Sequence, residues 1–318
     1  MKKAVNLKTA EPLKKIKYPG NLIVITGPTA SGKTAASISL AQHFHAPVLS
    51  ADSRQFFLEM NIGTAKPTPA ELKKAEHHFI GHLSIHDDYD AGKFEADALK
   101  LVEQLFQKHS IVLMAGGSGM YIDAVCKGFD PLPETDELLR EELTAVYKEK
   151  GIEALQKLLS ELDPKHYYAV DLNNPHRLIR ALEICIGTGK PYSSFRKGEP
   201  KERDFNIIKI GLELERKELY ARIDARVDKM MEDGLLEEVR SLQEFKHLNA
   251  LQTVGYRELF AYLDGEISLE EAVEKIKQDT RNFAKRQLTW FRKDKDITMF
   301  APSDIKGMVK FIEKKCAS

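Results

Sequence analysis

The chain has 318 residues, and its 48 basic side chains balance 48 acidic ones, so the formal net charge is zero. This length allows a sizeable core and two domains. A net charge of zero indicates no particular class of binding partner, so any such evidence must come from local clusters of charge. The cysteines Cys126, Cys185 and Cys316 are isolated, which argues against a C-x-x-C metal site and favours a reducing compartment. No apolar run approaches the roughly 20 residues of a membrane helix. Residues 1–20 are rich in lysine and lack a signal-peptide core, so we expect a cytoplasmic protein with a basic amino-terminal extension.

The first predicted elements are a buried strand at 22–26 and a helix at 33–44, joined by a loop that fits G-x-x-x-x-G-K-[ST]. Successive backbone N–H groups of such a loop form an anion nest at the start of the helix. Lys33 adds a point charge, and the hydroxyl of Thr34 is placed to hold Mg²⁺. The alternative is a glycine-rich turn with a surface lysine. We predict a phosphate site made of Gly27, Pro28, Thr29, Ala30, Ser31, Gly32, Lys33 and Thr34.

The rest of the chain alternates between two kinds of pattern. Residues 21–129 alternate short apolar strands with helices, which is typical of a parallel α/β sheet. Residues 130–200 form helices with charged faces, and a further strand follows before helices continue to the end. We therefore predict a P-loop core over 21–129 and 201–318, flanked by helices and interrupted by an all-helical insertion at 130–200. The later strands are predicted at 48–50, 111–114 and 206–214.

The carboxylate expected of an NTP-hydrolysing P-loop protein is missing, because the strand at 111–114 ends in Ala-Gly-Gly. Asp52 instead follows the strand at 48–50. The carboxyl ends of parallel strands open onto the ligand crevice, so we predict that Asp52 faces the phosphate site and acts as a base. The alternative from position alone is an aspartate that caps the next turn.

A local basic cluster lies near the carboxyl end. Residues 275–295 contain eight basic and two acidic side chains, and Arg281, Lys285 and Arg292 form a stripe if the helix is continuous. This pattern is consistent with a nucleic-acid backbone footprint. The alternative is a solvated amphipathic helix whose aromatic residues pack into the core, and we expect Trp290 in the core.

Eight segments of the chain form an ordered set of motifs: 27–34 (GPTASGKT), 51–55 (ADSRQ), 61–67 (NIGTAKP), 77–80 (HHFI), 116–121 (GGSGMY), 174–177 (NPHR), 254–257 (VGYR) and 281–292 (RNFAKRQLTWFR). They occur in the order found in bacterial tRNA dimethylallyltransferases, and the chain resembles this family over roughly residues 20–295. The resemblance implies transfer of a dimethylallyl group from dimethylallyl diphosphate to the exocyclic amine of the adenine just 3′ of the anticodon, with Mg²⁺ as cofactor. In the family the P-loop holds the diphosphate and an aspartate matching Asp52 is the base.

The resemblance also implies further site residues. Ser118 stands where the family has a threonine near the target nucleotide, and it keeps the hydroxyl. Arg222 or Arg226 reaches the donor diphosphate, and the sequence leaves open which of them does so. His176 replaces the family's glutamine, which puts its particular contact in doubt. The expected catalytic residues are Asp52, Lys33, Thr34 and Ser118. The expected tRNA contacts are Asp52, Ser53, Arg54, Gln55, Ser118, Arg140, His176, Arg177, Leu178, Ile179, Arg180, Arg281, Lys285 and Arg286.

Buried Asp52 cannot reach a base stacked in RNA, so the adenine must be extruded into the crevice. We expect the insertion and the carboxyl-terminal helices to hold the RNA arm from two sides, and we expect a monomer. Three alternatives remain at this point. They are an adenylate isopentenyltransferase, a P-loop small-molecule kinase that uses Asp52 as base, and a non-catalytic nucleotide-dependent RNA-binding protein.

Overall fold

The computed structural model describes residues 20–196 and 198–317, and these residues form two compact units. One unit contains the chain up to Cys126 and again from Arg203, and the other contains Lys127–Glu202. The predicted basic extension at 1–20 lies, except for Gly20, outside the described residues.

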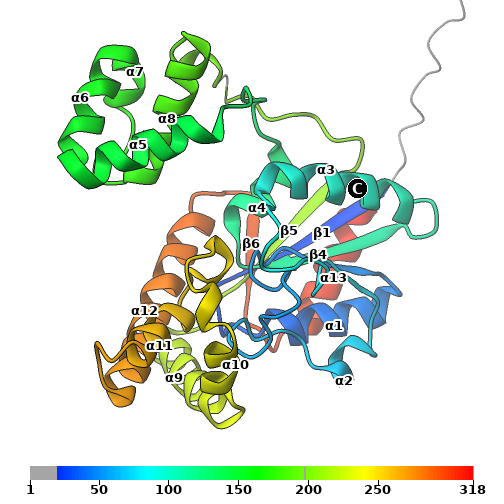
Figure 1. The fold of residues 1–318 in the computed structure, drawn as a ribbon. Helices are drawn as coiled ribbons and strands as arrows, with labels where there is room; N and C mark the ends of the chain where they lie inside the picture. Colours follow the sequence, from blue (N-terminus) through cyan, green and yellow to red (C-terminus); the bar gives the residue numbers. More distant parts are fainter. Residues whose placement is uncertain (1–19, 197, 318) are drawn as a thin grey trace, which may run out of the picture. The chain divides into compact units, whose positions relative to one another are not determined.

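The first unit is built on a six-stranded parallel sheet with the order β3-β2-β4-β1-β5-β6. This sheet and its flanking helices are shown in Figure 1 and confirm the predicted fold class. Because all strands are parallel, their carboxyl ends meet at one edge, where β1 and β4 are in register up to Thr26 opposite Gly116. The strands are β1 (Asn21–Thr26), β2 (Val48–Ser50), β3 (His77–His78), β4 (Ile111–Gly116), β5 (Asn206–Leu212) and β6 (Ile297–Phe300).

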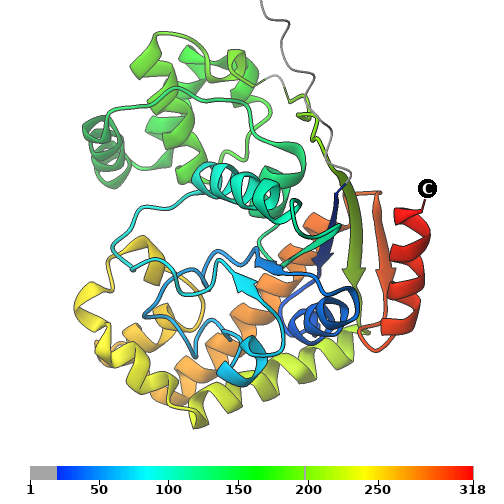
Figure 2. The same cartoon turned by 90° about the vertical axis from the view of Figure 1, so that its right-hand side faces the viewer.

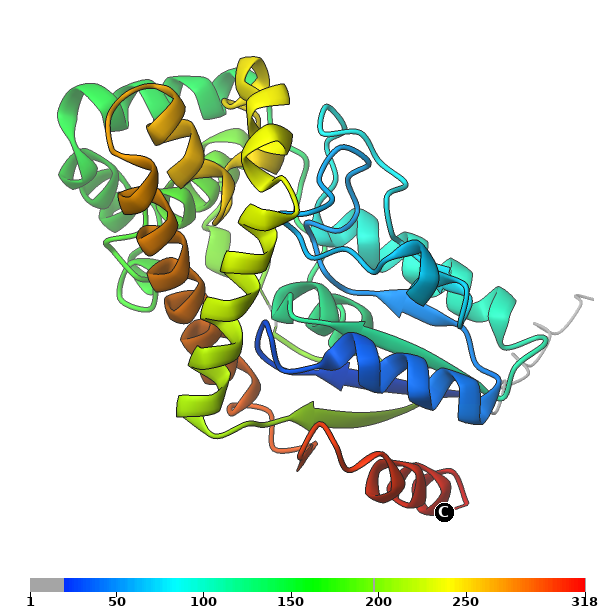
Figure 3. The same cartoon turned by 90° about the horizontal axis from the view of Figure 1, so that it is seen from below.

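Alternate side chains of β1 face opposite sides of the sheet, and both sides are buried. Leu22 and Val24 pack against α3 (Ala91–Leu105) and α4 (Gly119–Lys127). Ile23 and Ile25 pack with α1 (Lys33–Phe44) and α13 (Ile305–Cys316) on the other face (Figure 3). Burial on both faces explains why the strand is a continuous apolar run. In Figure 2, β6 forms one edge of the sheet, with α13 beside it.

A helical layer faces the carboxyl ends of the strands (Figure 3). In this layer α9 and α12 run side by side, and a separate apolar core holds the layer together around the fully buried Tyr256. Ser268 caps α12 through a reciprocal bond pattern with Glu271, which starts this long helix at a defined residue. The layer contains α9 (Arg216–Glu232), α10 (Leu235–Ser241), α11 (Tyr256–Leu263) and α12 (Leu269–Phe291). The short helix α2 (Pro69–Leu72) belongs to the β2–β3 connection.

The second unit, which we call the insert, is helical, as predicted for this part of the chain. Its core consists mainly of leucines from three helices, such as Leu143, Leu155 and Leu182. The ends of the insert are joined by a hydrogen bond from the Lys201 N–H to the Lys127 carbonyl (2.7 Å). The helices are α5 (Glu137–Lys150), α6 (Ile152–Leu162), α7 (Pro164–Tyr167) and α8 (Pro175–Thr188).

The structure changes four details of the predicted strands. The strand predicted at 111–114 continues to Gly116, and the one predicted at 206–214 ends at Leu212. The two-residue strand β3 adds an edge next to β2, and β6 adds the other edge within the stretch that was predicted to contain only helices. Pairing with a neighbouring strand, which lies elsewhere in the chain, decides both the shifted boundaries and the two added strands.

Candidate active site

The predicted phosphate loop joins β1 to α1 at the carboxyl edge of the sheet. Gly32 precedes the helix with φ 92°, a left-handed conformation that favours glycine. The Lys33 ammonium bonds the loop carbonyls of Gly27 (2.9 Å) and Pro28 (2.7 Å). Ser31 Oγ is buried and has no hydrogen-bond partner among the described residues. The loop therefore combines a helix N-terminus, a cation and a spare hydroxyl, which are components of an anion site.

The pKa of Lys33 is lowered to about 8, chiefly by burial; the negative charge of Asp52 opposes this shift, and the positive charge of Arg226 adds to it. Burial also lowers the pKa of the Arg226 guanidinium, which Asp52 raises. Arg226 Nη1 lies 3.5 Å from Thr29 Oγ1 on the phosphate loop. Two half-buried cations and one carboxylate give this region a positive field that favours an anionic ligand.

Asp52 lies on the walls of two adjoining cavities. A small cavity of about 40 Å³ contains Lys33, Thr34 and Ser50, and a larger one of about 390 Å³ opens on the other side of Asp52. One oxygen, Oδ1, also accepts the Arg54 N–H (3.1 Å). Asp52 therefore caps the turn that follows it and also lines both cavities, so the two positions considered from the sequence occur together.

The loop after β4 lies beside the Asp52 loop. Ser118 Oγ accepts the N–H of Ser53 (3.0 Å) and bonds its hydroxyl (3.2 Å), so the hydroxyl predicted for the site ties the two loops together. The Gln55 side chain lines the small cavity, and its amide donates to the carbonyls of Thr64 (3.1 Å) and Ala65 (3.2 Å), two residues that line the larger cavity.

Helices α9 and α12 complete the larger cavity. Arg226 lines it, whereas Arg222 lies one turn away with 44% of its side chain exposed and bonds Glu218 on its own helix (2.8 Å). On α12, Arg286 and Phe283 line the cavity, with the guanidinium 5.7 Å from the ring centre. Both arginines therefore lie near the phosphate loop, since a Cβ added at Gly32 would lie 3.8 Å from Arg222 Nη1, but of the two Arg226 is the one that lines the larger cavity.

The other cations of the predicted stripe on α12 are placed differently. The helix is continuous, but Arg281 pairs with Asp224 (2.5 Å) and Arg292 with Glu213 (3.2 Å). Lys285 lines a separate groove on the opposite face of the helix. Of the basic residues expected on α12 to contact RNA, Arg286 is the one that lines the cavity with Asp52.

The expectation that Trp290 belongs to the core is wrong. Its side chain is 41% exposed, it lines the larger cavity, and its indole N–H donates to Asp123 (2.9 Å). The ring lies against Gly119, where an added Cβ would come within 2.5 Å of it. The absence of a side chain at Gly119 gives the ring a backbone to pack on at the cavity wall, so it need not enter the core.

In the insert, residues 176–179 of α8, which were expected to contact tRNA, divide into an exposed pair and a buried pair. His176 and Arg177 are exposed, whereas Leu178 and Ile179 are buried in the insert's core, so the expected RNA contacts of these two side chains are wrong. The helical period explains the split, because residues 178, 179 and 182 share the apolar face.

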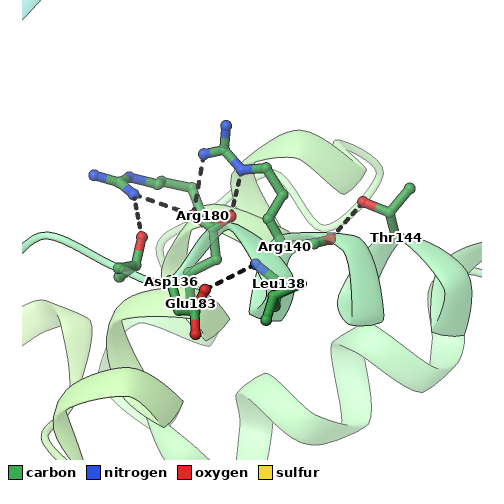
Figure 4. A network of polar contacts seen from close by, with 7 residues as sticks. Asp136, Leu138, Arg140, Thr144, Arg180 and Glu183 are labelled. Atoms are coloured by element: carbon green, nitrogen blue, oxygen red, sulfur yellow. Dashed lines mark hydrogen bonds and ion pairs between the residues drawn. The ribbon is translucent and has the colours of Figure 1, made fainter.

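Arg140 of α5 and Arg180 of α8 are held together by one carboxylate (Figure 4). Glu183 is fully buried and pairs with both guanidinium groups, and Arg180 also bonds Thr135 (3.1 Å). These hydrogen bonds and positive charges hold the pKa of Glu183 below its usual value despite burial. Both arginines keep part of their side chains exposed, so they remain accessible to an anion.

Several cavity residues were not assigned roles from the sequence. Most of them belong to segments that carried the family resemblance, whereas Thr253 and Thr280 each directly precede such a segment. Each segment also contains residues with a structural role, so spacing alone did not single out the lining residues. The unassigned lining residues include Gly63, Met120, Tyr121, Thr253, Gly255, Thr280, Phe283, Gln287 and Trp290.

Magnesium fits the small cavity on the chemistry of its donors. Thr34, Ser50 and Asp52 supply hydroxyl and carboxylate oxygens, the ligands that this hard cation prefers. Among residues 20–196 and 198–317, no cluster of three or more His, Cys, Asp or Glu residues could hold a metal.

No helix in this described part is long and apolar enough to span a membrane.

A parallel sheet with a phosphate loop, and a carboxylate that lines both the cavity at this loop and an organic-sized cavity, define a P-loop fold with room for an organic ligand beside an anion. The chain belongs to the IPP transferase family, whose model matches residues 55–294. This match confirms the family resemblance and the transferase class.

Close relatives extend the match over nearly the whole chain. It is 51% identical over 294 residues to tRNA dimethylallyltransferase 1 of Phocaeicola vulgatus, covering 92% of this chain and 98% of that protein. The tRNA dimethylallyltransferase of Christiangramia forsetii is 53% identical over 295 residues, with the same coverage.

Solved structures agree. The full-length tRNA isopentenylpyrophosphate transferase of Bacillus halodurans matches with a TM-score of 0.70 at 37% identity, covering 93% of this chain and 97% of that one. A eukaryotic dimethylallyltransferase acting on tRNA matches with a TM-score of 0.72 at 27% identity, covering 90% of this chain and 75% of that one.

Proposed function

We propose that the protein transfers a dimethylallyl group from dimethylallyl diphosphate to the exocyclic amine of the adenine that follows the anticodon in tRNA. The names of the close relatives support the reaction and its RNA acceptor. The observation that carries the proposal is the place of Asp52, which lines both the phosphate-side cavity and the larger cavity. We infer a cytoplasmic monomer, since tRNA is the substrate and one chain supplies the whole cavity.

The donor diphosphate binds the loop from Gly27 to Thr34. Its growing negative charge is stabilised by backbone amides, Lys33 and Arg226, which are already in place before the reaction. We assign the donor contact to Arg226 rather than Arg222, because Arg226 is half-buried with its guanidinium beside Thr29, whereas Arg222 is exposed and pairs with Glu218. Magnesium held by Thr34 would neutralise part of the diphosphate charge.

Transfer forms one bond and breaks another. The amine nitrogen of adenine attacks the allylic carbon, and the electron pair of the carbon–oxygen bond leaves with diphosphate. The adenine amine is a poor nucleophile, because its lone pair is delocalised into the ring. Asp52 takes the amine proton as the new bond forms, a role that typically contributes ~10²–10⁴-fold in rate.

The larger cavity receives the adenine. Its volume of about 390 Å³ lies within the range of small-molecule sites, roughly 300–1,000 Å³. Tyr121, Phe283 and Trp290 supply aromatic surface on its wall, which suits a base removed from its stack. Ser118 places a hydroxyl next to Asp52 for a polar contact with the nucleotide.

The insert supplies contacts to the RNA backbone. His176, Arg177, Arg140 and Arg180 present cationic or polar groups on its surface, and two of these cations are oriented by Glu183 (Figure 4). Arginine forks match phosphate oxygens in geometry and charge. Arg54 and Arg286, at the larger cavity, provide further contacts near the target nucleotide.

The test incubates purified protein with Mg²⁺, labelled dimethylallyl diphosphate and unmodified tRNA, with AMP and ATP as parallel acceptors. We expect label in tRNA, and we expect Asp52→Ala to reduce transfer by ~10²-fold or more while donor binding persists. Label in AMP would indicate an adenylate isopentenyltransferase. ATP consumption without label would indicate a kinase, and full activity of Asp52→Ala would remove Asp52 from the mechanism.

A further inference from the structure

One glutamine links the loops that follow β1 and β4. Gln287 lies near the end of α12, and its side-chain oxygen accepts the backbone N–H of Thr29 (2.8 Å). Its amide nitrogen donates to the backbone carbonyl of Gly117 (2.9 Å). The residue is 6% exposed, so neither bond is exchanged readily for water.

The two partners belong to opposite sides of the proposed reaction. Thr29 is part of the phosphate loop, beside Arg226. Gly117 is followed directly by Ser118, whose hydroxyl is bonded to the loop carrying Asp52. A single amide therefore connects the donor cradle with the turn that faces the acceptor.

The local geometry is specific for this side chain. An added Cβ at Gly117 would come within 2.3 Å of Gln287 Nε2, so the glycine is what lets the amide approach. A glutamine side chain is long enough to reach both loops, and its amide both accepts and donates a hydrogen bond. An ionised glutamate of the same length only accepts, and methionine offers only a weak thioether acceptor. Asparagine is one methylene shorter.

We propose that Gln287 is a positioning residue that sets the distance between the donor cradle and the acceptor turn. In-line attack needs the amine nitrogen and the allylic carbon within about 3–3.5 Å, and a misplacement near 1 Å can cost ~10²-fold in rate. Each substrate binds mainly to its own loop, so loss of the link affects their mutual alignment more than their separate binding. This inference rests on the proposed function.

The first test compares Gln287→Met with wild type, using Gln278→Met, at an exposed position on the same helix, as the matched control. We expect Gln287→Met to lower kcat about 10- to 100-fold, with KM for donor and tRNA within about threefold. The control should match wild type. Unchanged kcat in Gln287→Met would overturn the proposal, as would a kcat loss accompanied by equal weakening of both substrates and a lower melting temperature.

The second test uses Gln287→Glu, which keeps an acceptor for Thr29 but cannot donate to Gly117 when ionised. Protonation restores a donor, and burial raises the pKa of a carboxyl above its usual value near 4.3. We expect the kcat of this variant, relative to wild type, to rise severalfold as pH falls from 8 to 6. A ratio that does not change with pH would overturn the role of the bond to Gly117.

These experiments also separate the inference from the function on which it rests. Absence of dimethylallylated tRNA with the wild-type protein would refute the proposed function. Active wild-type protein with an equally active Gln287→Met variant would refute the positioning role alone.

Discussion

Asp52 and Arg226 show how single side chains define the site. Both face the region next to the phosphate loop, where Asp52 raises the pKa of the arginine and burial lowers it. Arg222, one turn earlier on α9, forms an exposed ion pair with Glu218. The two arginines thus form a natural pair for comparison, with the same residue type on the same helix.

Replacing Arg226 with alanine should weaken donor binding, because a charged hydrogen-bonding group contributes about 1.5–3 kcal/mol, or roughly 10- to 150-fold. Arg222→Ala should change donor affinity less than about threefold, since an exposed pair contributes little. Donor Kd measured by calorimetry without tRNA checks both variants. Equal losses in the two variants would contradict the assignment of Arg226.

The pKa of Lys33, about 8, predicts a pH dependence of donor binding. Below pH 8 the ammonium carries its charge, and above pH 8 the free protein increasingly holds a neutral amine. Donor Kd should therefore be nearly constant from pH 6.5 to 7.5 and rise by up to tenfold per unit above pH 8. The control is Lys33→Arg, whose guanidinium stays charged, and whose donor Kd should show no such rise whatever its absolute value.

At the scale of elements, the connection after β2 is fixed to the helical layer by Glu238 of α10. Its carboxylate accepts the backbone N–H groups of Asn61 (3.0 Å), Ile62 (2.8 Å) and Gly63 (3.0 Å), as well as the Tyr256 hydroxyl (2.6 Å). Gly63 lines the larger cavity, so this contact also shapes the proposed acceptor site.

Glu238→Ala should lower the free energy of unfolding by about 2–3 kcal/mol, since it leaves several donors without their charged acceptor. Glu237→Ala on the same helix is the control, and its exposed side chain should contribute less than about 0.5 kcal/mol. Urea denaturation of both variants measures the difference. Similar stability of the two variants would show that the loop does not depend on Glu238.

Element boundaries were predictable where local chemistry sets them. The helix predicted at 33–44 matches α1, because a left-handed glycine starts it and an apolar face continues it. The strand end at Leu212 was not predictable, because it depends on pairing with β6, whose residues lie far along the chain.

At the scale of the whole molecule, the two units present different chemistry. The first unit holds the phosphate loop and the larger cavity, whereas the insert carries exposed arginines on a small apolar core. A substitution in the insert therefore tests RNA binding without altering the donor cradle.

Arg177→Ala in the insert should raise the tRNA Kd and reduce the slope of log Kd against log salt by about one. Donor Kd should remain unchanged. Arg240→Ala, an exposed arginine of α10 in the first unit, is the control and should leave both quantities at their wild-type values. An unchanged salt slope for Arg177→Ala would show that this side chain makes no phosphate contact.

The fold class and the family were predictable from the sequence, and the phosphate loop was proposed from it, because these inferences depend on local patterns: glycines at fixed offsets, apolar runs and ordered motifs. Tertiary structure decided which members of each pattern face the cavity. Arg226 rather than Arg222, the exposed edge of Trp290, and the bridge from Gln287 to Thr29 and Gly117 all depend on contacts between distant segments. Helical periodicity predicts which residues share a face of a helix, but only tertiary packing determines whether that face contacts the core, a cavity or solvent.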